Sequence, residues 1–201
     1  MQLTLPRISC ASAIFVIPLA TALSFSVIGA AHAQSLNLTQ PSYTHFSGGV
    51  GENSRGHRSI LIDAEYEFGY KWFATGHYQY TRQSSGDYRE SVIDVGVGRY
   101  FNIYDRTTLD VSASLGNFVQ DSNVFSGSGH TFYTLNGGIR QRHDAFEYRV
   151  GYRYIDMDGF SSDQGVVASA HVYFTPQTAL GVYFNDVYSN SNWSIGMRFL
   201  F

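Results

Sequence analysis

The chain has 201 residues, with 13 basic and 16 acidic side chains and a formal net charge of −3. This acidic balance argues against nucleic-acid binding, because proteins that bind nucleic acids neutralise phosphates with clusters of Lys and Arg. Aromatic residues make up 16% of the chain and glycine occurs 20 times, a composition that favours amphipathic strands over helices.

The first 33 residues have the pattern of a secretory signal peptide. Arg7 precedes an apolar run over residues 11–30, and Ala31-His32-Ala33 is the small-x-small pattern of a cleavage site. We expect residues 1–33 to be removed, which leaves residues 34–201 as one barrel domain and takes away the single cysteine, Cys10. A transmembrane anchor is the alternative, but Pro18 interrupts the apolar run.

The rest of the chain divides into short segments in which apolar and polar residues alternate. No later run of about 18 apolar residues occurs, so a membrane-spanning form must be a closed barrel. The predicted strands are 42–50, 59–69, 72–82, 89–101, 107–119, 131–141, 146–156, 165–175, 178–187 and 192–201. Short connections alternate with longer ones such as 121–129, as periplasmic turns and extracellular loops do. The sequence therefore predicts an all-β, transmembrane, antiparallel up-and-down β-barrel with ten strands, and eight strands is the alternative.

The alternation also predicts which side chains face the lumen. On the second strand, Ile60 and Ile62 alternate with Asp63 and Glu65. A charge that faces lipid near the midplane costs about 2 to 4 kcal/mol, so the carboxylates must point inward. The same reasoning gives a lumen charge network of Asp63, Glu65, Glu67, Asp94, Asp110, Arg140, Glu147, Arg149, Arg153 and Arg198, with His77, Gln79, Asn136 and His171 also inside. Arg99 is the exception, because it falls on the outward face near the periplasmic end.

Outward aromatic residues are expected to form two girdles at the membrane interfaces. The periplasmic set is Phe68, Trp72, Phe101, Phe146, Phe174 and Phe201, and the extracellular set is Tyr80, Tyr133, Tyr154, Phe184 and Trp193. A soluble β-sandwich is the alternative, but it would need a second sheet to cover these aromatics.

The lumen charges are expected to form an electrostatic plug. Counting depth from the periplasmic rim places Glu65 and Asp63 level with Arg149 and Arg153, and Asp110 level with Arg198. The alternative is a narrow polar pore for water, ions or small solutes.

Candidate catalytic residues are few. His45-Phe46-Ser47 has the His-x-Ser spacing of outer-membrane lipid A deacylases, but Gly48-Gly49 follows it, so we expect a packed lumen histidine. His130 and the acidic residues Asp156 and Asp158 lie where the omptin proteases have catalytic groups, yet no Asp-x-His element is present. With Asp163, these acids offer carboxylates to a divalent cation or form a solvated loop. We expect no enzyme activity, catalytic residue, cofactor or metal; an outer-membrane enzyme acting on lipid A or peptides is the rival hypothesis.

Two groups of residues predict partners. Arg55, Arg58, Arg82 and Arg89 in the first two extracellular loops are expected to contact lipopolysaccharide phosphates. The last strand alternates strictly, and its outward residues, which we expect the outer-membrane barrel assembly machinery to recognise for insertion, are Trp193, Ile195, Met197, Phe199 and Phe201. We expect outer-membrane lipid to surround the barrel. The sequence does not predict the oligomeric state.

Several segments resemble a known family. They are Ser42-Tyr43-Thr44, the hairpin rhythm around residues 66–80 and 95–111, the turn Phe174-Thr175-Pro176-Gln177-Thr178 and the ending Gly196-Met197-Arg198-Phe199-Leu200-Phe201. In these the chain resembles small, porin-like outer-membrane β-barrel proteins of Gram-negative bacteria linked to quorum sensing and vesicle-borne signalling. The resemblance implies location in the cell outer membrane and no catalytic motif.

Overall fold

The structure is a computed structural model that describes residues 40–83, 88–122, 125–187 and 190–201. The predicted signal peptide lies outside these residues. Ten strands follow one another: β1 (His45–Asn53), β2 (Arg58–Gly69), β3 (Trp72–Arg82), β4 (Arg89–Tyr104), β5 (Thr107–Ser122), β6 (Phe125–His143), β7 (Phe146–Met157), β8 (Asp163–Tyr173), β9 (Thr178–Val187) and β10 (Asn190–Leu200). No helix in this part of the chain is long and apolar enough to cross a membrane.

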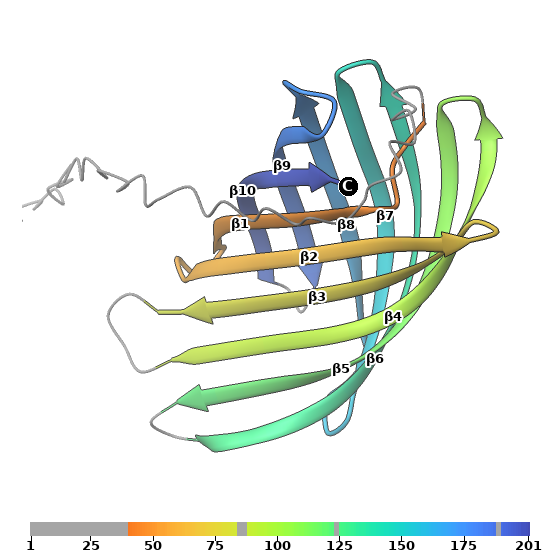
Figure 1. The fold of residues 1–201 in the computed structure, drawn as a ribbon. Coiled ribbons are helices and arrows are strands. Elements are labelled where there is room, and N and C mark those ends of the chain that lie inside the picture. Colours follow the sequence, from red (N-terminus) through yellow and green to blue (C-terminus); the bar gives the residue numbers. More distant parts are fainter. Residues whose placement is uncertain (1–39, 84–87, 123–124, 188–189) are drawn as a thin grey trace, which may run out of the picture. The chain divides into compact units, whose positions relative to one another are not determined.

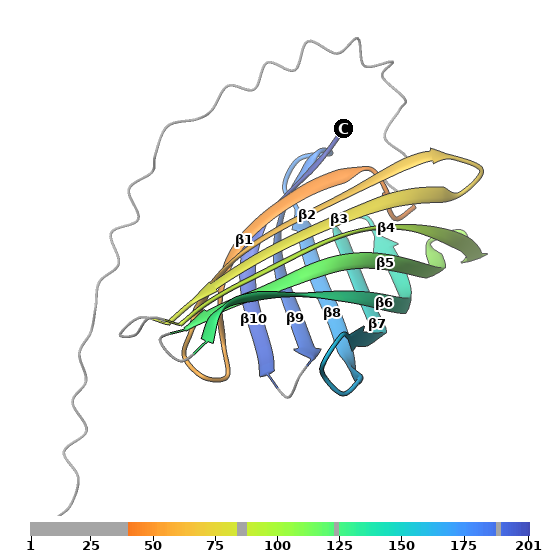
Figure 2. The same cartoon turned by 90° about the horizontal axis from the view of Figure 1, so that it is seen from below.

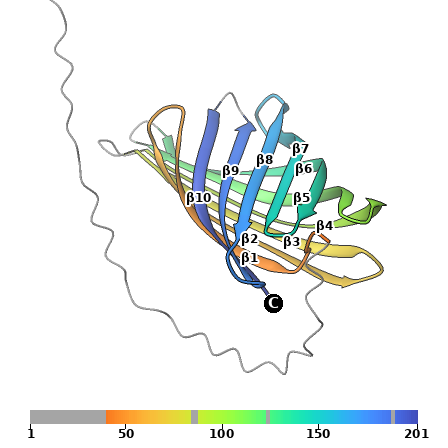
Figure 3. The ribbon, with the colours of Figure 1, turned by 90° about the horizontal axis from the view of Figure 1, so that it is seen from above.

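The strands form a closed antiparallel barrel in which each strand pairs with its neighbours in sequence (Figure 1). The barrel closes where β1 pairs with β10, from His45 opposite Leu200 to Asn53 opposite Asn192. Figures 2 and 3 show the strands of one wall, β8 to β10, running steeply across the direction of β2 to β4, as the strand tilt of a barrel requires. The predicted ten-strand barrel is confirmed, and the eight-strand alternative is wrong.

Several predicted strand bounds are wrong by a few residues, and two of the differences have a clear physical reason. The first strand begins at His45 rather than at Ser42, because the preceding residues turn into the lumen, where Tyr43 is buried. The expected long connection over residues 121–129 is mostly strand, since β5 continues to Ser122 and β6 already starts at Phe125. Gly, Ser and Asn mark this segment as a loop in the sequence, but pairing between the two long strands keeps it extended.

The two ends of the barrel differ. One end, which we call the turn end, has the connections 70–71, 105–106, 144–145 and 174–177. Strand β1 starts and β10 finishes at this end. Tyr70 and Lys71 both have positive φ, 54° and 65°, which is the backbone of a type I′ hairpin turn. The connections at the loop end are 54–57, 83–88, 123–124, 158–162 and 188–189.

The outward face is a continuous apolar surface. Val95, Leu115, Val150 and Ile195 lie in mid-strand on four different strands and remain 66%, 66%, 58% and 51% exposed. Arg99 also points outward, as predicted, and its guanidinium carbon lies 5.5 Å from the Trp72 ring centroid and 5.3 Å from that of Phe101. These aromatic faces support the cation at the turn end.

The inward face is packed more tightly than alternation alone suggests. Inward glycines leave room for rings on the next strand: a Cβ on Gly98 would overlap the Phe73 ring, and one on Gly116 would overlap Phe132. Both rings are 2% exposed. These side chains narrow the lumen at their levels, so the barrel is not an open tube there.

Candidate functional site

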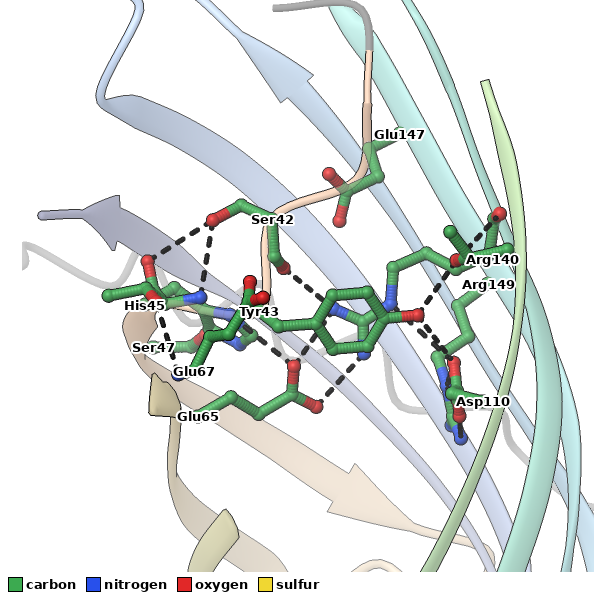
Figure 4. Close-up of polar contacts among 12 residues, drawn as sticks. Ser42, Tyr43, His45, Ser47, Glu65, Glu67, Asp110, Arg140, Glu147 and Arg149 are labelled. Carbon is green, nitrogen blue, oxygen red and sulfur yellow. Dashed lines mark hydrogen bonds and ion pairs between the residues drawn. The ribbon is translucent and has the colours of Figure 1, made fainter. Parts of the chain in front are cut away.

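Tyr43 is the centre of the lumen packing, although it precedes the first strand. Its side chain is 1% exposed, and its ring stacks on Tyr100 with 4.1 Å between centroids and lies 4.8 Å from Phe73. The Tyr43 hydroxyl lies 2.7 Å from Thr108 Oγ1 and donates to Asp110 Oδ2 at 3.4 Å. The chain before β1 is thus anchored across the barrel to β5 (Figure 4).

Arg140 of β6 lies beneath this ring and joins three parts of the chain. Its Nη1 and Nη2 donate to the two carboxylate oxygens of Glu65, each at 2.9 Å, and Nη1 also donates to the Ser42 carbonyl at 2.9 Å. The guanidinium carbon lies 4.3 Å from the Tyr43 ring centroid. Arg140 is 2% exposed, so these contacts replace the hydration of its two Nη atoms.

Asp110 continues the network on the other side of Tyr43. Arg149 of β7 donates to Asp110 through Nη2 at 2.6 Å and through Nε at 3.2 Å. The second Asp110 oxygen lies 3.8 Å from Arg140 Nε. One carboxylate therefore faces two guanidinium groups and the Tyr43 hydroxyl (Figure 4).

Glu147 forms a second buried centre nearer the turn end. It accepts a hydrogen bond from Arg198 Nη1 at 2.7 Å and lies 3.9 Å from Arg142 Nη1. Arg142 is 1% exposed, and its guanidinium carbon lies 4.0 Å from the Tyr173 ring centroid. Arg142 is not among the predicted lumen charges, although it lies two residues after Arg140 on the same strand face.

The predicted network residues lie on the inward face, but the pairings inferred from depth are wrong. Asp110 pairs with Arg149 and not with Arg198. Glu65 pairs with Arg140, whereas Asp63 accepts from His77 at 2.6 Å in the tautomer that protonates Nδ1. Because the strands are tilted, residues at the same number of positions from the turn end lie at different heights on opposite walls of the barrel. The long arginine side chains also reach carboxylates above or below their own height.

Three other predicted network members have local roles. Arg153 donates through Nε to Asn136 Oδ1 at 2.7 Å, and Glu67 accepts from the Tyr100 hydroxyl at 2.8 Å. Asp94 is 9% exposed and lines the lumen cavity, and it forms no ion pair with another described residue. His171 is buried and packs against the Tyr183 ring.

The candidate catalytic residues do not form an accessible centre. His45 and Ser47 are 2% and 1% exposed on the inward face of β1, and Ser47 Oγ accepts from Arg198 Nε at 3.4 Å. His130 Nδ1 lies 3.1 Å from the Asp158 carbonyl at the loop end. Within the described ranges, no group of three His, Cys, Asp or Glu side chains has the arrangement of a metal site, so Asp156, Asp158 and Asp163 do not come together.

Three of the four loop arginines form a row. Arg58 is opposite Arg82, and Arg82 is opposite Arg89, on three adjacent strands. All three are exposed and belong to the outward face. Arg55 instead lies in the connection before β2 and lines a cavity at the loop end. There, burial and the Glu90 carboxylate raise the pKa of the Tyr88 phenol above its ordinary value, so the phenol stays protonated and donates to Glu90.

The lumen also contains an apolar cluster that the sequence analysis missed. Phe132, Ile155 and Met157 are buried together near the loop end, with Val92 and Phe118 packed against them. Alternation on β4 to β7 indicates that these side chains face inward, but they carry no charge that would require the lumen, so a pattern of inward charges does not mark them. The cluster borders a cavity of about 280 Å³, and a cavity of about 140 Å³ lies between it and the ion-pair network.

The comparisons with known proteins show the fold. No protein-family model matches the chain, and no curated protein matches it. The solved structure of the NanC porin aligns with a TM-score of 0.53 at 7% identity, over 78% of this chain and 100% of that chain. The KdgM porin aligns with a TM-score of 0.47 at 12% identity, over 79% and 99%. The outer-membrane enzyme PagL aligns with a TM-score of 0.42 at 12% identity, over 79% and 100%. The alignment with the NanC porin and the closed ten-strand order together show the porin-like fold of an outer-membrane β-barrel.

Proposed function

We propose that this protein is an integral protein of the Gram-negative outer membrane. The observation that supports this location is the uninterrupted apolar outward face, because soluble proteins rarely expose apolar patches larger than a few hundred Å². On β4, the outward residues Ile93, Val95 and Val97 are exposed between Arg89 at one end and Arg99 at the other. Such a band flanked by charges fits a lipid bilayer, with the turn end in the periplasm.

We further propose that the barrel does not conduct and acts as a plugged scaffold that presents its loop end to the outside. The observation that carries this proposal is Arg140, fully buried between Glu65, Tyr43 and the Ser42 carbonyl across the lumen. Together with the buried Arg142, Glu147 and Arg198, these side chains fill the turn end of the barrel. An ion would have to separate several buried ion pairs to pass.

Planar-bilayer recording of the purified full chain tests this proposal. We expect no reproducible unitary current steps from the wild-type protein, and small steps from Tyr43→Ala, which removes the ring over Arg140. Reproducible wild-type steps would instead support the second candidate, a narrow pore. The two cavities of about 140 and 280 Å³ between the network and the loop end favour that candidate, because they already form part of a path for ions along the lumen.

The row of Arg58, Arg82 and Arg89 supports lipopolysaccharide as a partner. Residues directly opposite each other in an antiparallel pair have Cβ atoms about 4.5 to 5.5 Å apart, so the three arginines start from neighbouring positions at the loop-end edge of the apolar face. Arginine binds phosphate through paired N–H donors. A row placed at this height matches the phosphates of lipid A in the outer leaflet.

Binding to vesicles with and without lipid A phosphates tests the row. We expect the protein with all three arginines changed to Gln to lose most of its preference for phosphorylated lipid A. Lys71→Gln, an exposed cation at the turn end, is the control and should keep the preference. Equal binding of the wild type to phosphorylated and dephosphorylated lipid A would overturn this partner.

We propose no catalytic activity for the chain. The support is the burial of His45 and Ser47 at the packed turn end, where no lipid or peptide reaches them. The test is mass spectrometry of lipid A and of peptides after incubation with the protein. Products that disappear with His45→Ala, Ser47→Ala or His130→Ala would establish the enzyme hypothesis instead. Recognition by the assembly machinery and a role in vesicle-borne signalling remain predictions.

A further inference from the structure

The loop-end half of the lumen combines an apolar wall with an arginine side chain, Arg153, whose guanidinium is positioned by a hydrogen bond. The wall consists of Phe132, Ile155 and Met157 with Val92 and Phe118, and it borders the cavity of about 280 Å³. Small-molecule sites are mostly apolar cavities of about 300 to 1,000 Å³ with a few placed polar groups. At about 280 Å³ the cavity lies just below that range and therefore suits a small ligand.

Arg153 is the polar group best placed in this cavity. Its Nε donates to Asn136 Oδ1 at 2.7 Å, and the Asn136 amide donates to Thr134 Oγ1 at 3.2 Å. Thr134 Oγ1 in turn lies 2.6 Å from Ser114 Oγ. This chain of hydrogen bonds holds the guanidinium by one edge. Arg153 lines both lumen cavities.

The free edge of Arg153 distinguishes it from the other inward arginines. Arg140, Arg142, Arg149 and Arg198 each lie within ion-pair distance of a carboxylate. Among the described residues no carboxylate lies within that distance of Arg153, and none accepts a hydrogen bond from its Nη atoms. A guanidinium with a free Nη edge is arranged to bind a carboxylate through two parallel hydrogen bonds.

Asp94 limits what the site accepts. It lines the same cavity as Arg153 and carries the opposite charge. A ligand with a single anionic group therefore gains from Arg153 and loses from Asp94, so the two residues have opposite effects on its affinity. Asn185, whose amide oxygen is buried without a partner in the described part of the chain, adds a polar group to the same wall.

We propose that this cavity binds a small amphipathic monocarboxylate, with its apolar body against Phe132, Ile155 and Met157 and its carboxylate on Arg153. Since the turn end is filled by the buried network, the ligand enters and leaves at the loop end. The ligand site rests on the proposed function in one respect only, namely that the loop end faces the outside of the cell. Binding itself requires neither conductance nor a lipopolysaccharide contact.

Calorimetry on the full chain in lipid nanodiscs tests the site, with empty nanodiscs as the reference. The probes are 4-phenylbutyrate and the uncharged 4-phenylbutanol, which share their apolar body. We expect saturable binding at one site and at least a tenfold preference for the carboxylate. Arg153→Gln should abolish the preference, and Asp94→Asn should strengthen carboxylate binding severalfold. Met157→Gln should weaken both probes by a similar factor.

Two further variants keep the test decisive. Asn136→Ala leaves the charge of Arg153 but removes its hydrogen-bonded support, so the carboxylate preference should fall to an intermediate value even if Arg153→Gln does not fold. Arg99→Gln changes an outward arginine and should bind both probes like the wild type. No saturable binding, an unchanged preference in the Arg153 and Asn136 variants, or weaker carboxylate binding by Asp94→Asn would overturn the proposal. Conductance and lipid A binding, measured on the same samples, show separately whether the proposed function holds.

Discussion

The guanidinium of Arg140 and the carboxylate of Glu65 meet inside the barrel through two hydrogen bonds of 2.9 Å, although they belong to β6 and β2. Arg140 is 2% exposed and Glu65 17%. Removing one partner of a buried pair costs about 3 to 5 kcal/mol, because the other charge is left unpaired. The pair therefore fixes how the two walls of the barrel approach each other.

We expect Arg140→Gln to lower the free energy of unfolding by about 3 to 5 kcal/mol. The double variant Arg140→Gln with Glu65→Gln should recover part of this loss, because no unpaired Glu65 charge remains. Urea unfolding from lipid vesicles, followed by the fluorescence of Trp72 and Trp193 on the outward face, measures the effect. If the loss of unfolding free energy in the double variant equals the sum of the losses in the two single variants, the two residues are not coupled.

Tyr43 should contribute more through its ring than through its hydroxyl. Tyr43→Phe keeps the stacking on Tyr100 and removes the contact with Thr108, so we expect a loss of about 1 kcal/mol in unfolding free energy. Tyr43→Ala leaves a cavity beside Arg140 and should cost about 3 to 5 kcal/mol. The same vesicle unfolding assay compares them. Equal effects would mean that the ring is not part of the packed plug.

Two glycines on adjacent strands provide a matched test of lumen packing. A Cβ on Gly98 would overlap the buried Phe73 ring, whereas a Cβ on Gly76 meets nothing within 4 Å. Gly98→Ala should lower the unfolding free energy by about 1 to 3 kcal/mol, the usual cost of overpacking. Gly76→Ala should be neutral or slightly stabilising. A larger loss of unfolding free energy for Gly76→Ala than for Gly98→Ala would place the packed core on the other face of the sheet.

The outward face provides a test of membrane depth. Val95 lies on β4 between the outward arginines Arg89 and Arg99, near the middle of the apolar band. Val95→Arg should cost about 2 to 4 kcal/mol in vesicles, whereas Ile103→Arg, beyond Arg99 at the turn end, should cost about 0 to 1 kcal/mol. Folding yield and unfolding free energy in vesicles report both. Equal costs at the two positions would contradict the proposed span.

The amino-acid sequence by itself determined the class of fold and the facing of most side chains. A period of two residues separates the two faces, so Asp110, Arg149 and Val150 are assigned inward or outward without knowledge of their neighbours. The turn residues between the periodic segments gave ten strands, most of them within a few residues of the observed bounds. These features are local, and local rules suffice to predict them.

Only the tertiary structure decided which lumen residues meet. Asp110 pairs with Arg149 rather than with the predicted Arg198, because strand tilt sets the relative heights of opposite walls and no short segment encodes it. Tyr43 enters the lumen because Arg140, Thr108 and Tyr100, distant in sequence, together form the site that its ring fills. The apolar cavity wall likewise exists only once β4 to β7 bring Phe132, Ile155 and Met157 together.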